Sequence, residues 1–152
     1  MDDYFEEVIV ADYNLEAAEN AVKKIGKDHY RAIQVDVFDK EKLVSIMNEV
    51  DVVANGAGPF YKLLEPVIDA LFESTCKNYV DICDDISAIN DVMTEENKKR
   101  AEEEGRRIII GLGGSPGLIP VEVMYAASMM DDVHTAGLYM VMDELVEGGV
   151  AV

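Results

Sequence analysis

The chain has 152 residues, of which 49% are hydrophobic, and its 31 acidic and 13 basic residues give a formal net charge of −18. This length and composition fit one globular domain with an ordinary core rather than a disordered chain or a two-domain enzyme. The negative charge argues against nucleic acid and anionic membranes as partners, because both would repel this surface. We expect a cytoplasmic protein, since the sequence shows neither a secretion signal nor a transmembrane run, and its two cysteines fit no disulfide framework.

The hydrophobic pattern predicts alternating strands and helices over residues 1–130. Strands are expected at residues 7–11, 30–37, 51–55, 79–83 and 107–111. Helices are expected at residues 15–25, 39–47, from 61 or 64 to 74, once or twice within 87–105, and from about 118 to 130. Because short connections join these elements, the pattern predicts a parallel sheet with helices on both faces, which is a doubly wound α/β fold.

The composition changes after residue 130. Residues 134–142 have the composition of a strand, and residues 143–152 are acidic and contain glycine without an apolar helix. We therefore expect residues 1–130 to form one domain. Residues 131–152 are expected to contain the first strand of a second, α+β domain.

Asp12, followed by Tyr13, is the first candidate for a binding role. An acidic residue at the carboxyl end of a strand in a dinucleotide-binding fold can accept hydrogen bonds from an adenosine ribose. The alternative is an aspartate that only shapes the turn or caps the next helix, and Asn14 can cap that helix equally well. Because Tyr13 rather than an arginine follows Asp12, nothing here neutralises a 2′-phosphate, which mildly favours NAD over NADP.

Two further candidate segments follow the second and third predicted strands. Asp36 and Val37 can contact an adenine ring, or Asp36 can be an ordinary solvated residue at a strand end. The third strand leads into small residues that let the backbone approach a ligand closely. The alternative for this segment is a tight turn with Pro59 in the first turn of a helix. The segment comprises Asn55, Gly56, Ala57, Gly58, Pro59 and Phe60.

Two other segments carry weaker signals. Asp81, Asp84 and Asp85 match no cation-binding spacing, so we expect a solvated loop and no metal site. Residues 111–117 are rich in glycine, but they lack the Lys-Ser/Thr ending of a phosphate loop, and Pro116 stands where a GxGxxG turn requires Gly or Ala. We expect a corner beside the active crevice there. The sequence assigns no catalytic residue.

Five segments, taken in order, resemble the NAD(P)-binding domain of the saccharopine dehydrogenase family. They are VIVADYN at 8–14, VDV at 35–37, DVVANGAGPFY at 51–61, NYVDICDD at 78–85 and GLGGSPGL at 111–118. The resemblance implies a Rossmann-like fold, NAD or NADP as cofactor, and chemistry at a C–N bond of an amino-acid derivative. It also implies that Asp12 meets the adenosine ribose, that Asp36 and Val37 meet the adenine, and that residues 56–60 meet the diphosphate and ribose side.

The sequence departs from this family near its start. A complete member begins with a strand and a GxGxxG turn ahead of the strand expected here at residues 7–11, and this sequence has neither. We therefore expect an incomplete Rossmann-like sheet that lacks its first, central strand. The two exposed edges can pair with each other, accept a strand from another chain, or belong to a loosely folded region. Cofactor binding by the isolated chain is doubtful, because the missing turn would hold the pyrophosphate.

Two hypotheses about function follow. The first is a fragment of a saccharopine dehydrogenase-like oxidoreductase of amino-acid metabolism, such as that of lysine, inactive alone, whose parent enzyme transfers hydride between a nicotinamide cofactor and an amino-acid-derived substrate. The alternative is an accessory or split-gene subunit that completes its sheet with a partner chain or within a homo-oligomer. An acidic α/β domain that binds no nucleotide is a plainer third reading, so whether the chain is an enzyme stays open.

Overall fold

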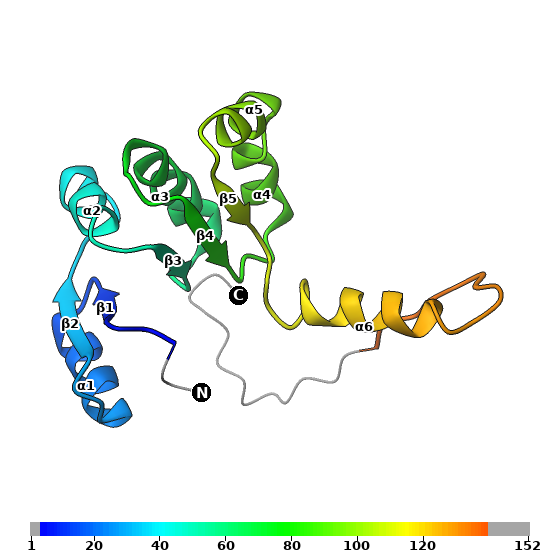
Figure 1. Cartoon of the computed structure of the whole chain (residues 1–152), viewed down its shortest axis with the longest axis horizontal. Coiled ribbons are helices and arrows are strands. Elements are labelled where there is room, and N and C mark those ends of the chain that lie inside the picture. The colour runs from blue at the N-terminus through cyan, green and yellow to red at the C-terminus, as the bar shows by residue number, and fades with distance from the viewer. Residues whose placement is uncertain (1–3, 140–152) are drawn as a thin grey trace.

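The computed structural model describes residues 4–139, in which five strands alternate with six helices (Figure 1). In chain order these are β1 (Val8–Asp12), α1 (Leu15–Ile25), β2 (Tyr30–Gln34), α2 (Lys40–Met47), β3 (Val52–Asn55), α3 (Phe60–Glu73), β4 (Asn78–Asp81), α4 (Ile86–Val92), α5 (Glu95–Glu103), β5 (Arg107–Ile109) and α6 (Leu118–Ala127). The predicted α/β alternation is confirmed. The strand predicted at residues 134–142 does not form over residues 134–139, and residues 140–142 lie outside the described residues.

Short polar side chains and one glycine set the ends of the helices. Asn14, Asp39, Asp85 and Thr94 each accept a hydrogen bond from a backbone amide in the first turn of α1, α2, α4 and α5, respectively. Such caps satisfy amides that have no partner within the helix. Gly26 ends α1 with φ of +68°, in the left-handed region that favours glycine. Asn14 was predicted as a cap from the sequence, because a cap depends on neighbouring residues alone.

The strands are all paired in parallel, but they form two sheets. One sheet holds β1 and β2, with Val8 opposite Tyr30, and the other has the order β3-β4-β5. Within residues 4–139, no ladder joins β1 to β3, so the two edges do not pair with each other. A complete Rossmann sheet with the order 3-2-1-4-5-6 has one additional strand at this position. The fold is thus the incomplete doubly wound sheet that the sequence predicts.

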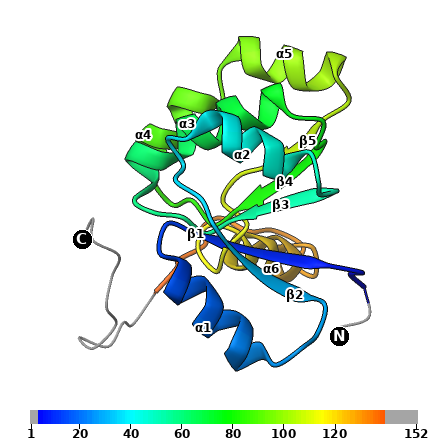
Figure 2. The same cartoon turned by 90° about the vertical axis from the view of Figure 1, so that its left-hand side faces the viewer.

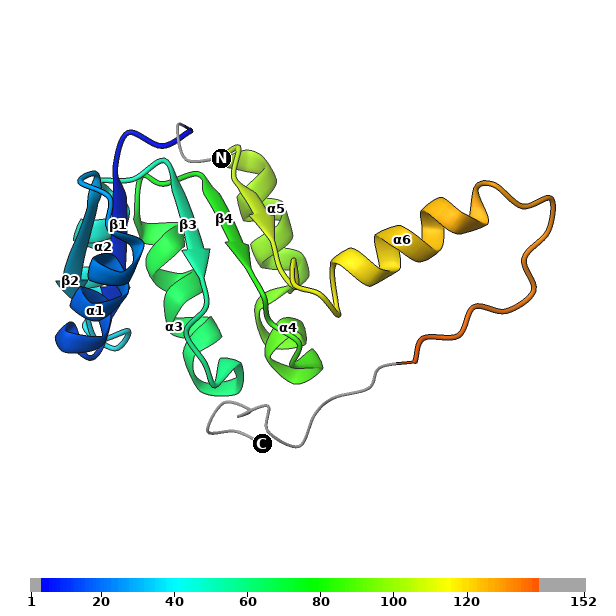
Figure 3. The same cartoon turned by 90° about the horizontal axis from the view of Figure 1, so that it is seen from below.

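Helices lie on both sides of the strands. Figure 2 shows α2 to α5 on one side and α1 and α6 on the other. The core lies between α3 and the three-stranded sheet, and its largest fully buried side chains are Leu64, Ile68, Leu71, Tyr79 and Cys83. Helix α6 contributes no buried residue and extends away beyond β5 (Figure 3). None of the helices in residues 4–139 is long and apolar enough to cross a membrane.

The three-stranded sheet buries only one of its faces. Val53, Tyr79 and Ile108 belong to the core or pack against it. On the opposite face of the sheet Val80 is half-buried, whereas Val52 and Ile109 keep 39% and 50% of their surface in contact with solvent. Because side chains alternate along a strand, this second face is apolar and uncovered in the described residues.

Candidate functional site

The predicted site residues lie at the carboxyl ends of the strands. Asp12 is the last residue of β1, and Asn55 is the last residue of β3. Strand β2 was predicted to reach residue 37 but ends at Gln34, so Asp36 and Val37 lie in the connection that follows it. Figures 2 and 3 show β1 and β3 running in the same direction, with their carboxyl ends on the same side of the molecule. Ligands of open α/β sheets bind at this end of the strands.

The sequence left open whether Asp12 binds a ribose or only shapes the turn or caps the next helix. In the structure, Asn14 is the cap of α1 and Asp12 is not. Asp12 Oδ1 accepts a hydrogen bond from the Asn14 amide at 2.8 Å, which shapes the turn, while Asn14 caps α1. The Asp12 side chain is exposed, as is that of Tyr13. Gln34 Nε2 donates to the Tyr13 carbonyl at 2.9 Å and so ties the ends of β1 and β2 together. The turn therefore holds Asp12 in place while leaving its carboxylate accessible.

Asp36 and Val37 belong to the turn between β2 and α2. Asp36 Oδ1 accepts a hydrogen bond from the Phe38 amide at 2.9 Å. Val37 packs partly against the core and also lines an open cavity of about 390 Å³ together with Phe38 and the α3 residue Pro66. Phe38, which the sequence analysis did not single out, is 67% exposed. The sequence signal for it was an aromatic residue directly after the VDV segment.

The segment after β3 forms an open loop in front of α3. Asn55 Oδ1 accepts a hydrogen bond from the Ala57 amide at 2.9 Å, and Pro59 occupies the N-cap position of α3, which begins at Phe60. A Cβ atom built at Gly56 would meet no atom within 4 Å, so the backbone there faces open space. A cavity of about 260 Å³ adjoins the loop, and it is lined by Ala54, Asn55, Gly56, Val80, Asp81, Ile82 and Leu112.

Beneath this loop lies a buried polar chain that the sequence analysis missed. Asp81 was expected in a solvated loop, which is wrong, because it is the last residue of β4 and only 2% exposed. Asn55 Nδ2 donates to the Tyr79 hydroxyl at 3.0 Å, and that hydroxyl donates to Asp81 Oδ2 at 2.8 Å. Asp81 Oδ1 accepts from the amides of Cys83 at 3.0 Å and Gly111 at 2.8 Å. The period-two spacing of Tyr79 and Asp81, with Tyr79 on the core face, was the available signal.

Burial and hydrogen bonds shift the acidity of three groups near the end of β4. Burial raises the pKa of Tyr79 well above its ordinary value, so its hydroxyl keeps its proton. Burial likewise raises the pKa of the Cys83 thiol. Hydrogen bonds from the Ser87 hydroxyl and the Ala88 amide lower the pKa of Asp85, which caps α4. Among residues 4–139, no three His, Cys, Asp or Glu side chains are grouped to hold a metal ion.

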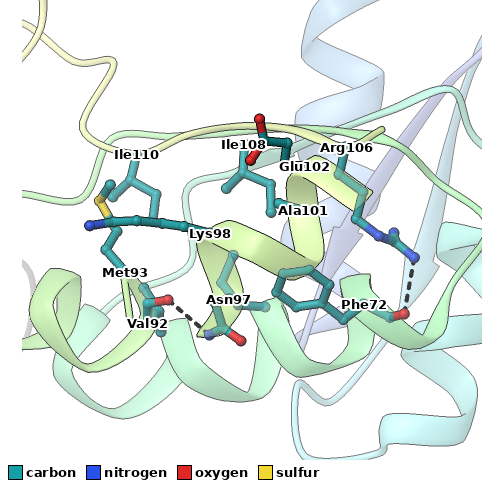
Figure 4. A pocket seen from close by; sticks show the side chains of 11 residues that line it. Phe72, Val92, Met93, Asn97, Lys98, Ala101, Glu102, Arg106, Ile108 and Ile110 are labelled. Carbon is teal, nitrogen blue, oxygen red and sulfur yellow. Dashed lines mark hydrogen bonds between the residues drawn. The ribbon is translucent and has the colours of Figure 1, made fainter. Parts of the chain in front are cut away.

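A larger cavity, of about 420 Å³, lies beside β5 on the helix-covered side (Figure 4). Its walls are mainly apolar and include Phe72 and Ile108, and no predicted site residue lines it. Arg106 at its edge donates hydrogen bonds of 2.7 to 3.0 Å to four backbone carbonyls, those of Leu71, Phe72, Ser74 and Cys76. This arginine therefore closes the carboxyl end of α3, a structural role, and the cavity is separate from the candidate site.

Comparisons with known proteins show the family and the fold. Residues 1–109 match the family model described as the saccharopine dehydrogenase NADP binding domain. The fold is similar to that of apo histidine-tagged saccharopine dehydrogenase (L-Glu forming) from Saccharomyces cerevisiae, with a TM-score of 0.66 and 20% sequence identity over 81% of this chain and 25% of that chain. The chain therefore spans about a quarter of that enzyme's length, and at this identity the likeness shows the fold alone.

Proposed function

This chain belongs to the saccharopine dehydrogenase NADP-binding domain family, and from that premise we propose that it is the cofactor-binding part of an oxidoreductase acting at a C–N bond of an amino-acid derivative. The observation that carries the proposal is the open loop after β3, where Gly56 has no neighbour in the way of a ligand. This loop follows the carboxyl end of β3, on the same side of the molecule as the end of β1. Asp12, the last residue of β1, is exposed there. An oxidoreductase cofactor needs such an extended, partly open cradle at the strand ends.

The described residues fit the two ends of a nicotinamide dinucleotide. Asp12 would accept hydrogen bonds from the adenosine ribose, while Asp36, Val37 and the exposed Phe38 would contact the adenine. Residues 56–60 would meet the diphosphate and ribose side, and the 260 Å³ cavity beside Ile82 offers room for the nicotinamide end. The bound cofactor would supply hydride transfer, and the chain would supply its position. No GxGxxG turn is present in the sequence to hold the pyrophosphate, so we expect weak binding.

We propose that NAD is preferred over NADP. The Asp12 carboxylate is exposed at the end of β1, where it would accept a hydrogen bond from a ribose 2′-hydroxyl but repel a 2′-phosphate. The residue that follows is Tyr13, not an arginine that could neutralise a phosphate. The family description names NADP, so this preference distinguishes the chain from its family's general label.

Calorimetric titration of the purified chain with NADH and NADPH tests both proposals. Binding with a Kd between micromolar and millimolar, tighter for NADH, supports them, whereas no binding of either at about 5 mM contradicts the cofactor role. Asp12→Asn is expected to weaken NADH binding about tenfold and to reduce the discrimination against NADPH. Asp28→Asn is the matched control, because Asp28 is also exposed but precedes β2, at the opposite end of the strands. Equal effects of the two variants would contradict the assigned role of Asp12.

We further propose that the isolated chain does not turn over. Neither the sequence nor the described residues assign an acid or base to the reaction, and the match covers only 25% of the yeast enzyme. Incubation of the chain with NADH and with candidate amino-acid derivatives should leave the absorbance of NADH unchanged. Sustained, substrate-dependent oxidation of NADH would overturn this proposal while leaving the cofactor role intact.

A second candidate function is that of a subunit completed by another chain. Among residues 4–139, β1 pairs only with β2 and β3 only with β4, and the apolar second face of the three-stranded sheet is uncovered. A parallel strand followed by a glycine turn and a helix would pair with both edges and cover that face. The partner in this proposal is a separate chain that carries such a strand–turn–helix segment, or a second copy of this chain that covers the exposed edges with its own.

Light scattering and amide exchange test this candidate. A mass of twice 16.8 kDa supports a homodimer, and a monomer with fast exchange along β1 and β3 supports a separate partner. A monomer whose β1 and β3 amides exchange as slowly as those of β4 contradicts it.

Cys76 and Cys83 are free, buried thiols, the ordinary state in a reducing compartment, which supports the predicted cytoplasmic location.

A further inference from the structure

Three consecutive hydrogen bonds beneath the cofactor loop run in one direction, from an exposed bond at Ala57 to a buried one at Asp81. The Ala57 amide donates to Asn55, whose own amide group donates to Tyr79, whose hydroxyl donates to Asp81. Tyr79 and Asp81 belong to β4, while Asn55 ends the neighbouring strand β3 directly opposite Asp81. Hydrogen bonds that share a direction polarise and strengthen one another, most of all in a region of low dielectric.

This chain of bonds fixes the orientation of the side-chain amide of Asn55. An asparagine amide can be turned by half a revolution with little change in shape, which would exchange its oxygen and its nitrogen. Here the Tyr79 hydroxyl requires a donor from Asn55, because its own proton is given to Asp81. The oxygen of Asn55 is therefore the atom left facing the Ala57 amide, and the loop takes its shape from that bond.

Asp81 also holds the loop that follows β5. Its Oδ1 accepts from the Gly111 amide, and its backbone carbonyl accepts from the Leu112 amide at 2.7 Å. Gly111 has φ of +78°, and a Cβ atom there would lie 3.2 Å from the Cys83 carbonyl oxygen, so glycine is favoured at this close approach. Gly56 and Leu112 both line the 260 Å³ cavity. One buried carboxylate thus connects two walls of that cavity.

We propose that Asp81, Tyr79 and Asn55 form a positioning relay that sets, from beneath, the geometry of the cofactor loop and of the Gly111 turn. The inference rests on the proposed cofactor role of this loop and adds three positioning residues to it. The proposal does not require any of these three side chains to contact the cofactor. Their effect is transmitted through the backbone amides of Ala57 and Gly111.

Tyr79→Phe is the decisive variant, because it keeps the buried ring and removes only the bridging hydroxyl. Amide exchange by NMR should rise about fivefold at Ala57 and Gly111 relative to Val67 in α3, which reports global opening. Tyr30→Phe in β2 is the matched control and should leave these two amides unchanged. A rise that is equal at all amides, or no rise at Ala57, would overturn the inference. Asp81→Asn is a second variant and should raise exchange at the same two amides. If Asp81→Asn does not fold, the result for Tyr79→Phe decides.

A titration with NADH separates this inference from the proposed function. Where the wild-type chain binds NADH, Tyr79→Phe should raise the Kd about fivefold, and Tyr30→Phe should not. An unchanged Kd together with faster exchange at Ala57 would overturn the link between the relay and the cofactor. Where the wild-type chain binds no NADH, the proposed function fails, and the exchange data alone decide whether the relay positions the loop.

Discussion

The molecule has two parts that share the proposed cofactor site but not the core. The two-stranded unit comprises β1, α1 and β2, and the three-stranded unit comprises β3 to β5 with α3 to α5. In the two-stranded unit, Ala18 is the only residue of 8–34 that is buried. The three-stranded unit holds Leu64, Leu71 and the other largest buried side chains. Two strands with one helix offer little apolar surface to bury, whereas three strands under several helices enclose a core. The adenosine side of the site therefore rests on the less stable unit.

The largest expected contrast involves one arginine from each unit. Arg106, with a side chain only 3% exposed, bonds four backbone carbonyls and Glu104, whereas Arg31, 39% exposed, pairs with Glu7 and Glu49 at the surface. Arg106→Ala leaves buried carbonyls without partners and should lower the free energy of unfolding by about 4 kcal/mol. Arg31→Ala should lower it by less than about 1 kcal/mol. Urea unfolding measures both, and similar losses would break the contrast.

A smaller contrast is expected from one apolar residue in each unit. Leu71 in α3 is fully buried, and Leu71→Ala should cost about 3 kcal/mol through lost contacts and a residual cavity. Ile9 in β1 is half-buried, so Ile9→Ala should cost about 1 kcal/mol or less. Urea unfolding followed by circular dichroism compares the two variants. A cost for Ile9→Ala equal to that for Leu71→Ala would show that β1 packs in solution against something more, such as a second copy of the chain.

The smallest expected effect is a dependence on pH confined to the three-stranded unit. Hydrogen bonds from Arg100 and Arg106 lower the pKa of Glu104 to about 2. Because this pKa is lower in the folded chain than in the unfolded one, the stabilisation is complete above the ordinary glutamate value of about 4.5 and is lost as pH falls toward about 2. NMR titration of the Glu104 carboxyl carbon checks the pKa. Glu104→Gln should flatten this part of the acid dependence of urea unfolding, and an unchanged dependence would contradict the assignment.

Much of the fold could be predicted because its signals are local. The caps at Asn14, Asp39 and Asp85 depend on residues two or three positions away. The end of β2 could not be predicted in this way. It was expected at residue 37, but β1 ends at Asp12, which stands opposite Gln34, so the ladder has no partner strand beyond that point. Asp36 then turns the chain toward α2 through its bond to the Phe38 amide.

By itself, the sequence determined the order of strands and helices, the helix caps and the family resemblance, because hydrophobic spacing and short motifs act over a few residues. It also identified the segments at the strand ends, from Asp12 to the loop at residues 56–60. Only the tertiary structure decided that Asp81 is buried rather than solvated, and that β1 and β3 stay in separate sheets. The period-two spacing of Tyr79 and Asp81 hinted at burial, but the partner that Asp81 bonds, the Gly111 amide, is distant in the chain, and no local pattern encodes such a partner.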